Sequence, residues 1–386
     1  MIERTLFSAD HEAFRDSFRR FMDKEIAPHH DAWEEQGYVD RAVWDKAGEN
    51  GFLCMTLPEA YGGSDADKLY SVVQMEELAR AGFSGIGYGL HSEIVAPYIL
   101  HYGTEAQKQK YLPKLATGEM VGAIAMSEPA AGSDLQGVKT TAMLQADGTY
   151  LINGSKTFIT NGWHADLVIL VAKTDPAAGA KGTSLFLIER GMPGFEKGKR
   201  LKKLGLKAQD TSELFFDNVK VPRENLLGEE GTALKKMLKG LDGARVNIAM
   251  GAVGAAQAAL DLSIDHARTR TQFGRPIGSF QLVQKLIVDM TVRVEAARAL
   301  GLRAAAALDS GRDVRTAASI AKLYATEAAH EVASMALQVH GGLGYATDYP
   351  IERIFRDTRG GTIPEGTTEV QTLIVGREIL GMSAIV

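Results

Sequence analysis

The stretch Leu167-Val168-Ile169-Leu170-Val171-Ala172 decides the fold class, because a short, continuously apolar run of this kind is typical of a buried β-strand. Similar short runs occur at residues 121–126, 150–154, 183–188 and 214–219. Turn signals such as Asp147-Gly148 and Asn153-Gly154 separate them. No long helical pattern intervenes, which favours an antiparallel sheet, barrel or sandwich over βαβ units. We therefore predict a central β domain over residues 122–230.

Helical periodicity dominates on both sides of this β domain. Towards the N-terminus, large apolar side chains recur at helical spacing: Phe14, Phe18, Phe21, Met22 and Ile26. They predict an N-terminal α-helical domain over residues 1–121. Beyond about residue 231, long helical segments are expected at residues 244–268, 279–310, 313–340 and after 368. Their lengths suit a C-terminal four-helix bundle over residues 231–386, so the predicted class is α+β.

Composition limits the classes of function. Hydrophobic residues make up 45% and charged residues 24% of the 386, which is typical of a soluble globular protein, and the net charge of −5 argues against nucleic-acid binding. The single cysteine, Cys54, excludes an internal disulfide and any zinc site made of four cysteines, or of two cysteines and two histidines. His29-His30-Asp31 lacks a third ligand at a matching offset, so we expect a satisfied or solvated histidine pair and no metal.

No targeting or membrane signal is present. The N-terminal residues lack a signal-peptide core and transit-peptide character, and no run of 18 apolar residues occurs. We therefore expect a cytoplasmic protein of bacterial type without membrane insertion.

Several turn-rich strings could hold a ligand. Met126-Ser127-Glu128-Pro129-Ala130-Ala131-Gly132-Ser133-Asp134 offers hydroxyl and N–H groups for a polar heterocycle or a phosphate. Lys156-Thr157-Phe158-Ile159-Thr160-Asn161-Gly162 adds an aromatic ring and two hydroxyls. Each string by itself also has the composition of an ordinary turn. Arg268-Thr269-Arg270-Thr271-Gln272-Phe273-Gly274-Arg275-Pro276 follows a long helix, where its arginines could bind a diphosphate or simply pair with the helix dipole.

The glycine-rich string Gly85-Ile86-Gly87-Tyr88-Gly89 is a poor dinucleotide fingerprint. It lacks the third glycine at the required offset and follows no strand. We interpret it as a place where helices approach closely or where the chain passes near a ligand.

Near the C-terminus, Gly360-Gly361-Thr362-Ile363-Pro364-Glu365-Gly366-Thr367-Thr368-Glu369-Val370-Gln371 places one carboxylate on a stiff turn. Pro364 should keep Ile363 out of helical conformation, so we expect this segment to enter extended, and Gly366 permits positive φ. Thr368 and Gln371 have the spacing of a capping box, which predicts that a helix begins here. Its dipole would favour the anionic form of Glu365 that a general base needs, although a surface glutamate beside a helix cap has the same pattern.

Together these motifs resemble the acyl-CoA dehydrogenase family of flavoproteins over essentially the whole chain. The N-terminal strings Glu25-Ile26-Ala27-Pro28-His29-His30, Trp33-Glu34 and Val43-Trp44-Asp45-Lys46-Ala47-Gly48 are most similar to long-chain members. The resemblance continues through residues 122–140 (GAIAMSEPAAGSDLQGVKT) and Gly205-Leu206-Lys207-Ala208-Gln209-Asp210-Thr211. The family's C-terminal signature appears as residues 270–274, Gln338-Val339-His340-Gly341-Gly342 and Glu365-Gly366-Thr367.

The resemblance implies FAD bound between the β domain and the helical bundle, in a homotetramer or homodimer whose subunits share flavin contacts. The residues implied to bind FAD are Met126, Ser127, Gly132, Ser133, Phe158, Ile159, Thr160, Arg270, Gln281, Gln338, Val339, His340, Gly341, Gly342, Thr367 and Glu369. Contacts with the acyl-CoA substrate are implied for Ser133, Asp242, Arg245 and Gly366.

The resemblance also implies a reaction, the α,β-dehydrogenation of an acyl-CoA thioester to the trans-2-enoyl-CoA, as in fatty acid β-oxidation. Glu365 would remove the α-proton, the β-hydride would pass to flavin N5, and an electron-transfer flavoprotein would accept the electrons. Members closest at the N-terminus carry the base at the position matching Ala244 and glycine where Glu365 stands. Because alanine cannot act as a base, Glu365 is the only matched candidate, as in short- and medium-chain members.

Three departures from the family pattern leave the acyl chain undefined. Pro364 replaces a common aromatic residue, Ala130 a usual glycine and Phe158 a frequent tryptophan. Two other functions are compatible with the same motifs: an acyl-CoA oxidase-type relative that uses O2, and a non-catalytic protein that binds CoA or flavin. The chain lacks the long C-terminal extension of many oxidases, and the base and flavin turns expected of an enzyme are present, so we rank both lower.

Overall fold

The computed structural model describes residues 6–310 and 314–384. The helices that precede the sheet are α1 (Ala9–Glu25), α2 (His30–Gln36), α3 (Ala42–Glu49), η1 (Glu59–Tyr61), α4 (Lys68–Arg80), α5 (Tyr88–Leu90), η2 (His91–Val95), α6 (Ala96–Tyr102) and α7 (Glu105–Ala116). The sheet region comprises β1 (Gly122–Ala125), η3 (Leu135–Gly137), β2 (Thr141–Leu144), β3 (Tyr150–Thr160), β4 (Leu167–Lys173), η4 (Gly179–Gly182), β5 (Thr183–Glu189), β6 (Phe195–Arg200), β7 (Thr211–Val221) and η5 (Arg223–Asn225). The elements that follow are α8 (Ala233–Thr269), β8 (Thr271–Gln272), β9 (Arg275–Pro276), η6 (Ile277–Ser279), α9 (Gln281–Asp309), α10 (Arg315–His340), α11 (Gly342–Tyr345), α12 (Pro350–Gly360) and α13 (Thr368–Leu380).

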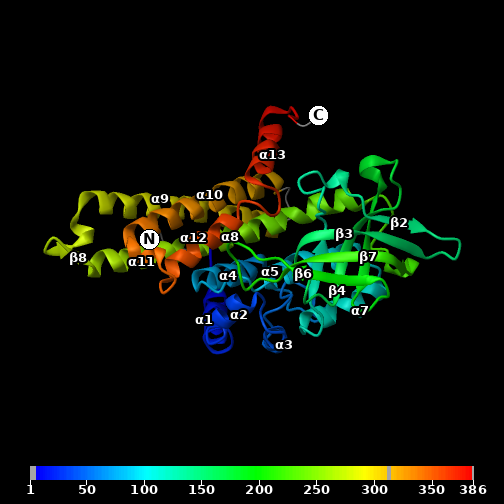
Figure 1. Cartoon of the computed structure of the whole chain (residues 1–386), viewed down its shortest axis with the longest axis horizontal. Coiled ribbons are helices and arrows are strands. Elements are labelled where there is room, and N and C mark those ends of the chain that lie inside the picture. The colour runs from blue at the N-terminus through cyan, green and yellow to red at the C-terminus, as the bar shows by residue number, and fades with distance from the viewer. Residues whose placement is uncertain (1–5, 311–313, 385–386) are drawn as a thin grey trace.

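The order helices, sheet, helices confirms the predicted fold class. The long helices α8, α9 and α10 pack on one another along the molecule, with the N-terminal helices beneath them and the sheet at one end (Figure 1). Helix α13 packs on α10 and projects from this layer (Figure 1).

A cap and an aromatic face specify the first helix. Ser8 and His11 form a capping box, in which the Ser8 hydroxyl accepts the His11 N–H at 3.4 Å and His11 Nδ1 accepts the Ser8 N–H at 3.0 Å. Phe18 and Phe21 face inward and each meets the ring of Phe52 at a centroid distance of 5.0 Å. This packing confirms the helix predicted from the spacing of the aromatic residues.

The sheet is mixed rather than wholly antiparallel. Its seven strands run in the order β1-β4-β2-β3-β7-β6, with β5 paired to β4. The antiparallel prediction is right for β2–β3, β3–β7, β4–β5 and β6–β7 and wrong for β1, which runs parallel to β4, and for a single parallel bridge between β2 and β4. Parallel neighbours need a crossover of a dozen or more residues, and residues 126–166, which include the β2–β3 pair, provide it.

Helix α8 extends beyond the segment expected from sequence, whereas α9 and α10 lie within theirs. Helix α8 begins at Ala233, eleven residues before the predicted start at residue 244. Helix α10 begins at Arg315; Asp313, where the prediction starts it, lies outside the described residues. Helix α12 was not predicted, although Pro350 stands at its first turn, where the missing N–H has no cost. Small side chains such as Ala259 and Ala333 line the core between these helices.

The glycine-rich string before η2 marks a close approach, as interpreted from sequence. A Cβ on Gly87 would lie 1.9 Å from Oδ1 of Asn161, and Asn161 Nδ2 donates to Gly87 O at 3.1 Å. Asn161 follows the last residue of β3, so glycine at position 87 lets the N-terminal helices contact the sheet at the end of that strand.

Candidate functional site

The turn between α12 and α13 carries Glu365. The N–H of Ile363 donates to Gly360 O at 3.3 Å, so the chain enters through a turn that closes α12, and the expectation of an extended entry is wrong. Glu365 has φ 56° and Gly366 has φ 93°. A non-glycine residue is strained in this left-handed region, and such strain is concentrated at functional sites.

Thr367, not Thr368, caps α13. The Thr367 hydroxyl accepts the Val370 N–H at 3.3 Å, whereas Thr368 donates its hydroxyl to Glu327. The Gln371 side chain does not reach back to a cap N–H but donates to the carbonyl oxygens of Glu365 and Gly366, at 3.0 Å each. The predicted capping box is therefore wrong, and Gln371 braces the turn instead.

Two cationic side chains donate hydrogen bonds to backbone carbonyls of the same turn. Lys322 Nζ, on α10, donates to Thr362 O at 3.1 Å and to Gly366 O at 2.8 Å. Arg245 Nε, on α8, donates to Glu365 O at 3.3 Å. In a planar trans peptide the N–H points opposite to the C=O of the same unit. The N–H groups of Gly366 and Thr367 therefore face away from the side chains that bind the carbonyls of Glu365 and Gly366.

Burial has the largest effect on the pKa of the Glu365 carboxyl group. Although the residue keeps partial exposure, desolvation by the surrounding protein raises the pKa of Glu365, and the charges of Arg245 and Lys322 oppose this shift. The helix dipole was expected to favour the anionic form of Glu365, and burial acts in the opposite direction. A carboxylate whose pKa is raised accepts a proton more readily, which suits a general base.

Asp242 and Arg245, expected to meet CoA, are joined to each other and to this turn. Arg245 Nη1 donates to Asp242 Oδ1 at 2.9 Å, and both side chains are buried one turn apart on α8. Through the bond from Arg245 to Glu365 O, this pair links α8 to the turn. The predicted base and two of the predicted substrate residues therefore share one site.

A second group of predicted residues lies where β1 and β3 end. The Thr157 N–H donates to Ser127 O at 3.0 Å, which holds the loop after β1 against β3. Beneath it, the fully buried Lys156 Nζ donates to Met126 O at 2.9 Å and to Glu128 Oε1 at 2.8 Å. Glu128 also accepts the N–H groups of Lys139 and Thr140, at 2.6 and 3.0 Å.

The surface at this end of β3 fits a flavin. A register shift between Lys156 and Ile159, together with φ 58° at Phe158, turns the Phe158 ring outward, where 69% of the residue is exposed. The hydroxyl residues Ser127 and Thr160 are half-buried beside it. An open aromatic face flanked by hydroxyls matches a planar heteroaromatic ring with polar edges. Ile159 is buried in the sheet core, so it could contact such a ring only through its main chain.

Gly132 and Ser133 lie in the exposed part of the loop after β1, and a Cβ on Gly132 would meet no atom within 4 Å. This loop could therefore receive a ligand at close range. Thr367 and Glu369, the other predicted FAD residues of this half of the molecule, lie in the first turn of α13 and its cap.

The remaining predicted FAD residues lie at the other end of the long helices. Arg270 and Gln281 flank the β8–β9 hairpin, which Figure 1 shows at the tip of the molecule farthest from the sheet. The rings of His266 and His340 stack at 4.4 Å, which brings residues 338–342 to the same tip. Gln338, Gly341 and Gly342 are exposed there, whereas the Val339 and His340 side chains are buried. Arg245, beside the Glu365 turn, and Arg270, at the tip, are 25 residues apart along α8, or about 37 Å at 1.5 Å per residue, so one chain does not bring the two groups together.

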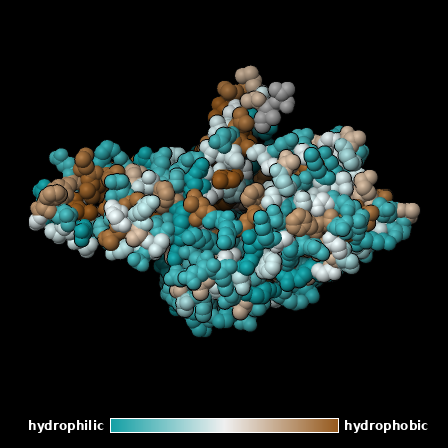
Figure 2. Space-filling model, viewed as in Figure 1, coloured by the Kyte–Doolittle hydropathy of each residue, from teal (hydrophilic) through white to brown (hydrophobic). Residues whose placement is uncertain are grey.

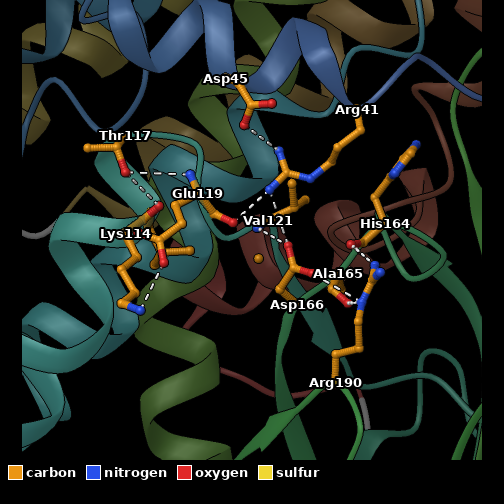
Figure 3. Close-up of polar contacts among 12 residues, drawn as sticks. Arg41, Asp45, Lys114, Thr117, Glu119, Val121, His164, Ala165, Asp166 and Arg190 are labelled. Atoms are coloured by element: carbon orange, nitrogen blue, oxygen red, sulfur yellow. Dashed lines mark hydrogen bonds and ion pairs between the residues drawn. The ribbon is translucent and has the colours of Figure 1, made fainter.

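A polar cluster not predicted from sequence fixes the turn that follows Thr160 (Figure 3). Asp166 pairs with Arg41 at 3.4 Å and with Arg190 at 3.1 Å, and Arg190 Nη2 donates to His164 O at 2.6 Å. A cavity of about 490 Å³ lies beside it. Its lining residues are Arg41, Trp163, His164, Arg190, Gly191, Phe195 and Lys197. None of the predicted site residues lines this cavity.

In the described ranges 6–310 and 314–384, no three His, Cys, Asp or Glu side chains are arranged as metal ligands. His30, which could have suggested a metal, is buried and bonds through Nε2 to Ser84 O at 2.9 Å, which confirms a satisfied histidine. No helix in the same ranges has the length and apolar character needed to cross a membrane.

Sequence reasoning missed the two buried lysines, Lys156 and Lys322. Each had a detectable signal. Lys322 is a lone charge on a helix face otherwise made of small residues, including Ala318, Ala321 and Ala325. Lys156 occupies an inward position of β3, where alternation calls for an apolar residue.

Comparison with known proteins agrees with this arrangement. The chain matches three family profiles: Acyl-CoA dehydrogenase, N-terminal domain, over residues 8–119; the middle domain, over 123–219; and the C-terminal domain, over 233–380. It is 42% identical to the long-chain specific acyl-CoA dehydrogenase of mouse mitochondria, over 98% of this chain and 89% of that protein.

Two solved structures are similar throughout. An acyl-CoA dehydrogenase from Geobacillus kaustophilus superimposes with a TM-score of 0.95 at 45% identity, covering 98% of this chain and 100% of that one. A chain in a structure described as the electron transferring flavoprotein of Acidaminococcus fermentans gives 0.94 at 40% identity, again over 98% and 100%.

The family matches place this chain among the flavin-dependent oxidoreductases that act on acyl-CoA thioesters. The chain belongs to the acyl-CoA dehydrogenase family.

Proposed function

We propose that the protein dehydrogenates an acyl-CoA thioester to the trans-2-enoyl-CoA, with Glu365 as the base that removes the α-proton. The observation that carries this proposal is the turn itself. It holds Glu365 with a positive φ and a carboxyl group of raised pKa, its backbone is bonded by Arg245 and Lys322, and Arg245 is paired with the buried Asp242. The position matching the alternative base is Ala244, which is buried and has no ionisable group.

The chain's own groups account for the acid–base part of the reaction. The α-proton of a thioester becomes removable when its carbonyl accepts preorganised hydrogen bonds in a site that excludes water. The outward N–H of Gly366 is a donor of this kind, adjacent to the base, and it supports the substrate contact predicted for Gly366. Glu365 Oε would then take the proton, and its raised pKa stabilises the protonated product of that step.

FAD fits the surface described above, with Met126, Ser127, Gly132, Ser133, Phe158 and Thr160 on one side and Thr367 and Glu369 near the base. When bound, it supplies the hydride acceptor for the β-carbon. The residues at the far tip, including Arg270, Gln281, Gly341 and Gly342, would serve the FAD of another subunit.

A homo-oligomer, tetramer or dimer, is part of this proposal. Helix α9 exposes Leu282, Val288 and Val292, and the C-terminal segment exposes Ile379 and Leu380. Figure 2 shows apolar residues over the projecting α13 and at the tip that carries β8. Large exposed apolar patches are typical of protein interfaces. Light scattering coupled to gel filtration should give a mass of at least two chains; a monomer with FAD bound and full turnover would contradict this.

The variant Glu365→Gln tests the base. It keeps the volume of the side chain but cannot accept the proton, so the purified protein should retain FAD and fail to bleach it when acyl-CoA is added without oxygen. Glu378→Gln, on the exposed side of α13, is the matched control and should bleach as the wild type does. Undiminished flavin reduction by Glu365→Gln would refute the assignment.

The electron acceptor separates this function from the oxidase alternative. We infer an electron-transfer flavoprotein as partner, which the description of the Acidaminococcus structure supports. Reduced enzyme should then be reoxidised by such a flavoprotein and form little peroxide in air. Rapid peroxide formation without an added acceptor would favour an oxidase, and protein unable to bind FAD would favour the non-catalytic alternative. A panel of acyl-CoAs in the bleaching assay would define the acyl chain, and the cytoplasmic location stays a prediction.

A further inference from the structure

Lys322 occupies a buried position, where its charged side chain is expected to lower the stability of the fold. Its side chain is fully buried, among the small residues Ala318, Ala321 and Ala325 of α10. In the part of the chain that the structure describes, no carboxylate forms a salt bridge with it, and its hydrogen-bond partners are Thr362 O and Gly366 O. Transfer of an ammonium group from water to such a place needs compensation, which two neutral carbonyls supply only in part. Burial accordingly lowers the pKa of Lys322 to about 8.

The two carbonyls lie on either side of the proposed base in the sequence. Thr362 precedes Glu365 by three residues, and Gly366 follows it directly. One ammonium group that donates to both therefore fixes the span of the turn, at 3.1 and 2.8 Å. The bond to Gly366 O, together with the one from Gln371 Nε2, orients the Gly366 carbonyl, and with it the Thr367 N–H on the opposite side.

We propose that Lys322 is a positioning residue for the dehydrogenation: its ammonium group orients the Glu365 turn, and its positive charge stabilises the Glu365 carboxylate. This inference rests on the proposed role of Glu365 as the base. It gives a functional reason for a buried charge that the packing of α10 does not require.

Other titratable groups surround this pair and share in its electrostatics. They are Arg245 on α8, Tyr98 on α6, Glu327 on α10, Arg359 on α12 and Glu369 on α13. Arg245 is the other cation that opposes the raised pKa of Glu365, but it also pairs with Asp242. Lys322 forms no salt bridge among the described residues, although the charge of Glu327 acts on it more strongly than that of Glu365 does.

Lys322→Met is a clean perturbation because the turn keeps its other hydrogen bonds. Thr362 O still accepts the Thr368 N–H at 3.1 Å, and Gly366 O still accepts Gln371 Nε2 at 3.0 Å. Methionine has nearly the same length and is apolar, so it suits the fully buried position, and among the described residues it leaves no salt-bridged carboxylate without its cation. The variant should therefore fold and bind FAD.

The kinetic consequences follow from the two roles. Loss of positioning should lower kcat about tenfold or more, with a small change in KM, because the reacting atoms lose their alignment. Loss of the charge should raise the pKa of Glu365 further, so the rise of kcat with pH should occur at higher pH than in the wild-type holoenzyme. Exchange of the substrate α-proton with D2O, which needs the base but no net electron transfer, should slow by the same factor as kcat.

Two further variants separate positioning from fold stability. Lys322→Gln keeps one donor and loses the charge, so it should recover part of kcat while the pH profile stays displaced. Val332→Ala removes buried volume from the same helix, away from the turn. It should lower stability by about 1 kcal/mol and leave both the pH profile and the exchange rate unchanged.

The outcomes distinguish this proposal from the proposed function. If Lys322→Met keeps the wild-type pH profile and exchange rate while Glu365→Gln is inactive, positioning by Lys322 is refuted and the base assignment stands. If Val332→Ala displaces the pH profile as much as Lys322→Met does, general destabilisation explains the effect and the proposal fails. If Glu365→Gln itself still turns over, the base assignment fails first.

Discussion

His91 joins the N-terminal helices to the sheet and should make the stability of the protein depend on pH. The ring is fully buried, its Nε2–H donates to Leu115 O at 2.9 Å, and its Nδ1 accepts the Gly122 N–H at 3.0 Å. These partners require the neutral ring, since a protonated Nδ1 could not accept the N–H that begins β1. Burial lowers the pKa of His91 to about 4.

The size of the effect follows from that value. In the unfolded chain a histidine has a pKa of about 6.5, so between about pH 6.5 and pH 4 the unfolded state binds a proton that the folded state does not. The free energy of unfolding should therefore fall as the pH falls through this range. A difference of about 2.5 pH units corresponds to about 3 kcal/mol at full protonation. His164, also buried with a pKa of about 4, acts in the same direction.

Urea unfolding of wild type and His91→Gln between pH 7 and pH 4.5 measures this contribution. The variant should be less stable at pH 7, because the bonds to Leu115 O and Gly122 N–H are disturbed, but it should lose up to about 3 kcal/mol less on acidification. His29→Gln, which removes an exposed ring, is the control and should follow the wild-type curve. Parallel curves for wild type and His91→Gln would refute the argument.

Two further substitutions test the supports of the flavin surface. Lys156→Met should destabilise the protein by about 3 kcal/mol and weaken FAD binding, because it leaves the Glu128 carboxylate buried without its cation. Thermal unfolding measures the stability, and titration of the apoprotein with FAD measures the binding. If Glu128→Gln in the same chain restores both, the unpaired charge is the cause. Gly87→Ala should lower the free energy of unfolding by about 1–3 kcal/mol, because its Cβ would overlap the Asn161 side chain. In urea unfolding, an additional Asn161→Ala should recover stability by relieving the clash. A Gly87→Ala variant as stable as wild type would contradict the close contact.

Local patterns predicted most elements of the fold because they depend on neighbours in sequence. The apolar run at residues 167–172 is β4, and the aromatic face of residues 14–22 lies in α1. The parallel pairing of β1 with β4 could not be predicted in this way, since strand direction depends on where a crossover of some forty residues returns. The misplaced cap has a similar origin: Thr367 and Thr368 can both cap a helix, and only the backbone conformation of the turn selects between them.

The sequence predicted the residues that would carry the chemistry of the candidate site, but not the buried residue that supports them. Glu365, Asp242 and Arg245 were chosen from motifs, and the structure brings them together. The inward-facing Lys322 was not chosen, because its role depends on a turn 40 residues away in sequence. The same limit applies to the pKa of Glu365: the helix N-terminus can be recognised in the sequence, whereas the effect of burial requires the packed structure.

Helix α8 also constrains how the length of this chain can change. Arg245 and Arg270 stand 25 residues apart, and all but the last of these positions belong to one uninterrupted helix. Inserting a single residue between them would rotate one end by about 100° relative to the other and lengthen the helix by about 1.5 Å. Arg245 would then point away from Glu365, or the hairpin at the tip would face another direction. Insertions and deletions should therefore be tolerated in the loops at either end of α8. Within the helix they should impair function, because α8 sets the distance and the relative orientation of the Glu365 turn and the hairpin at the tip.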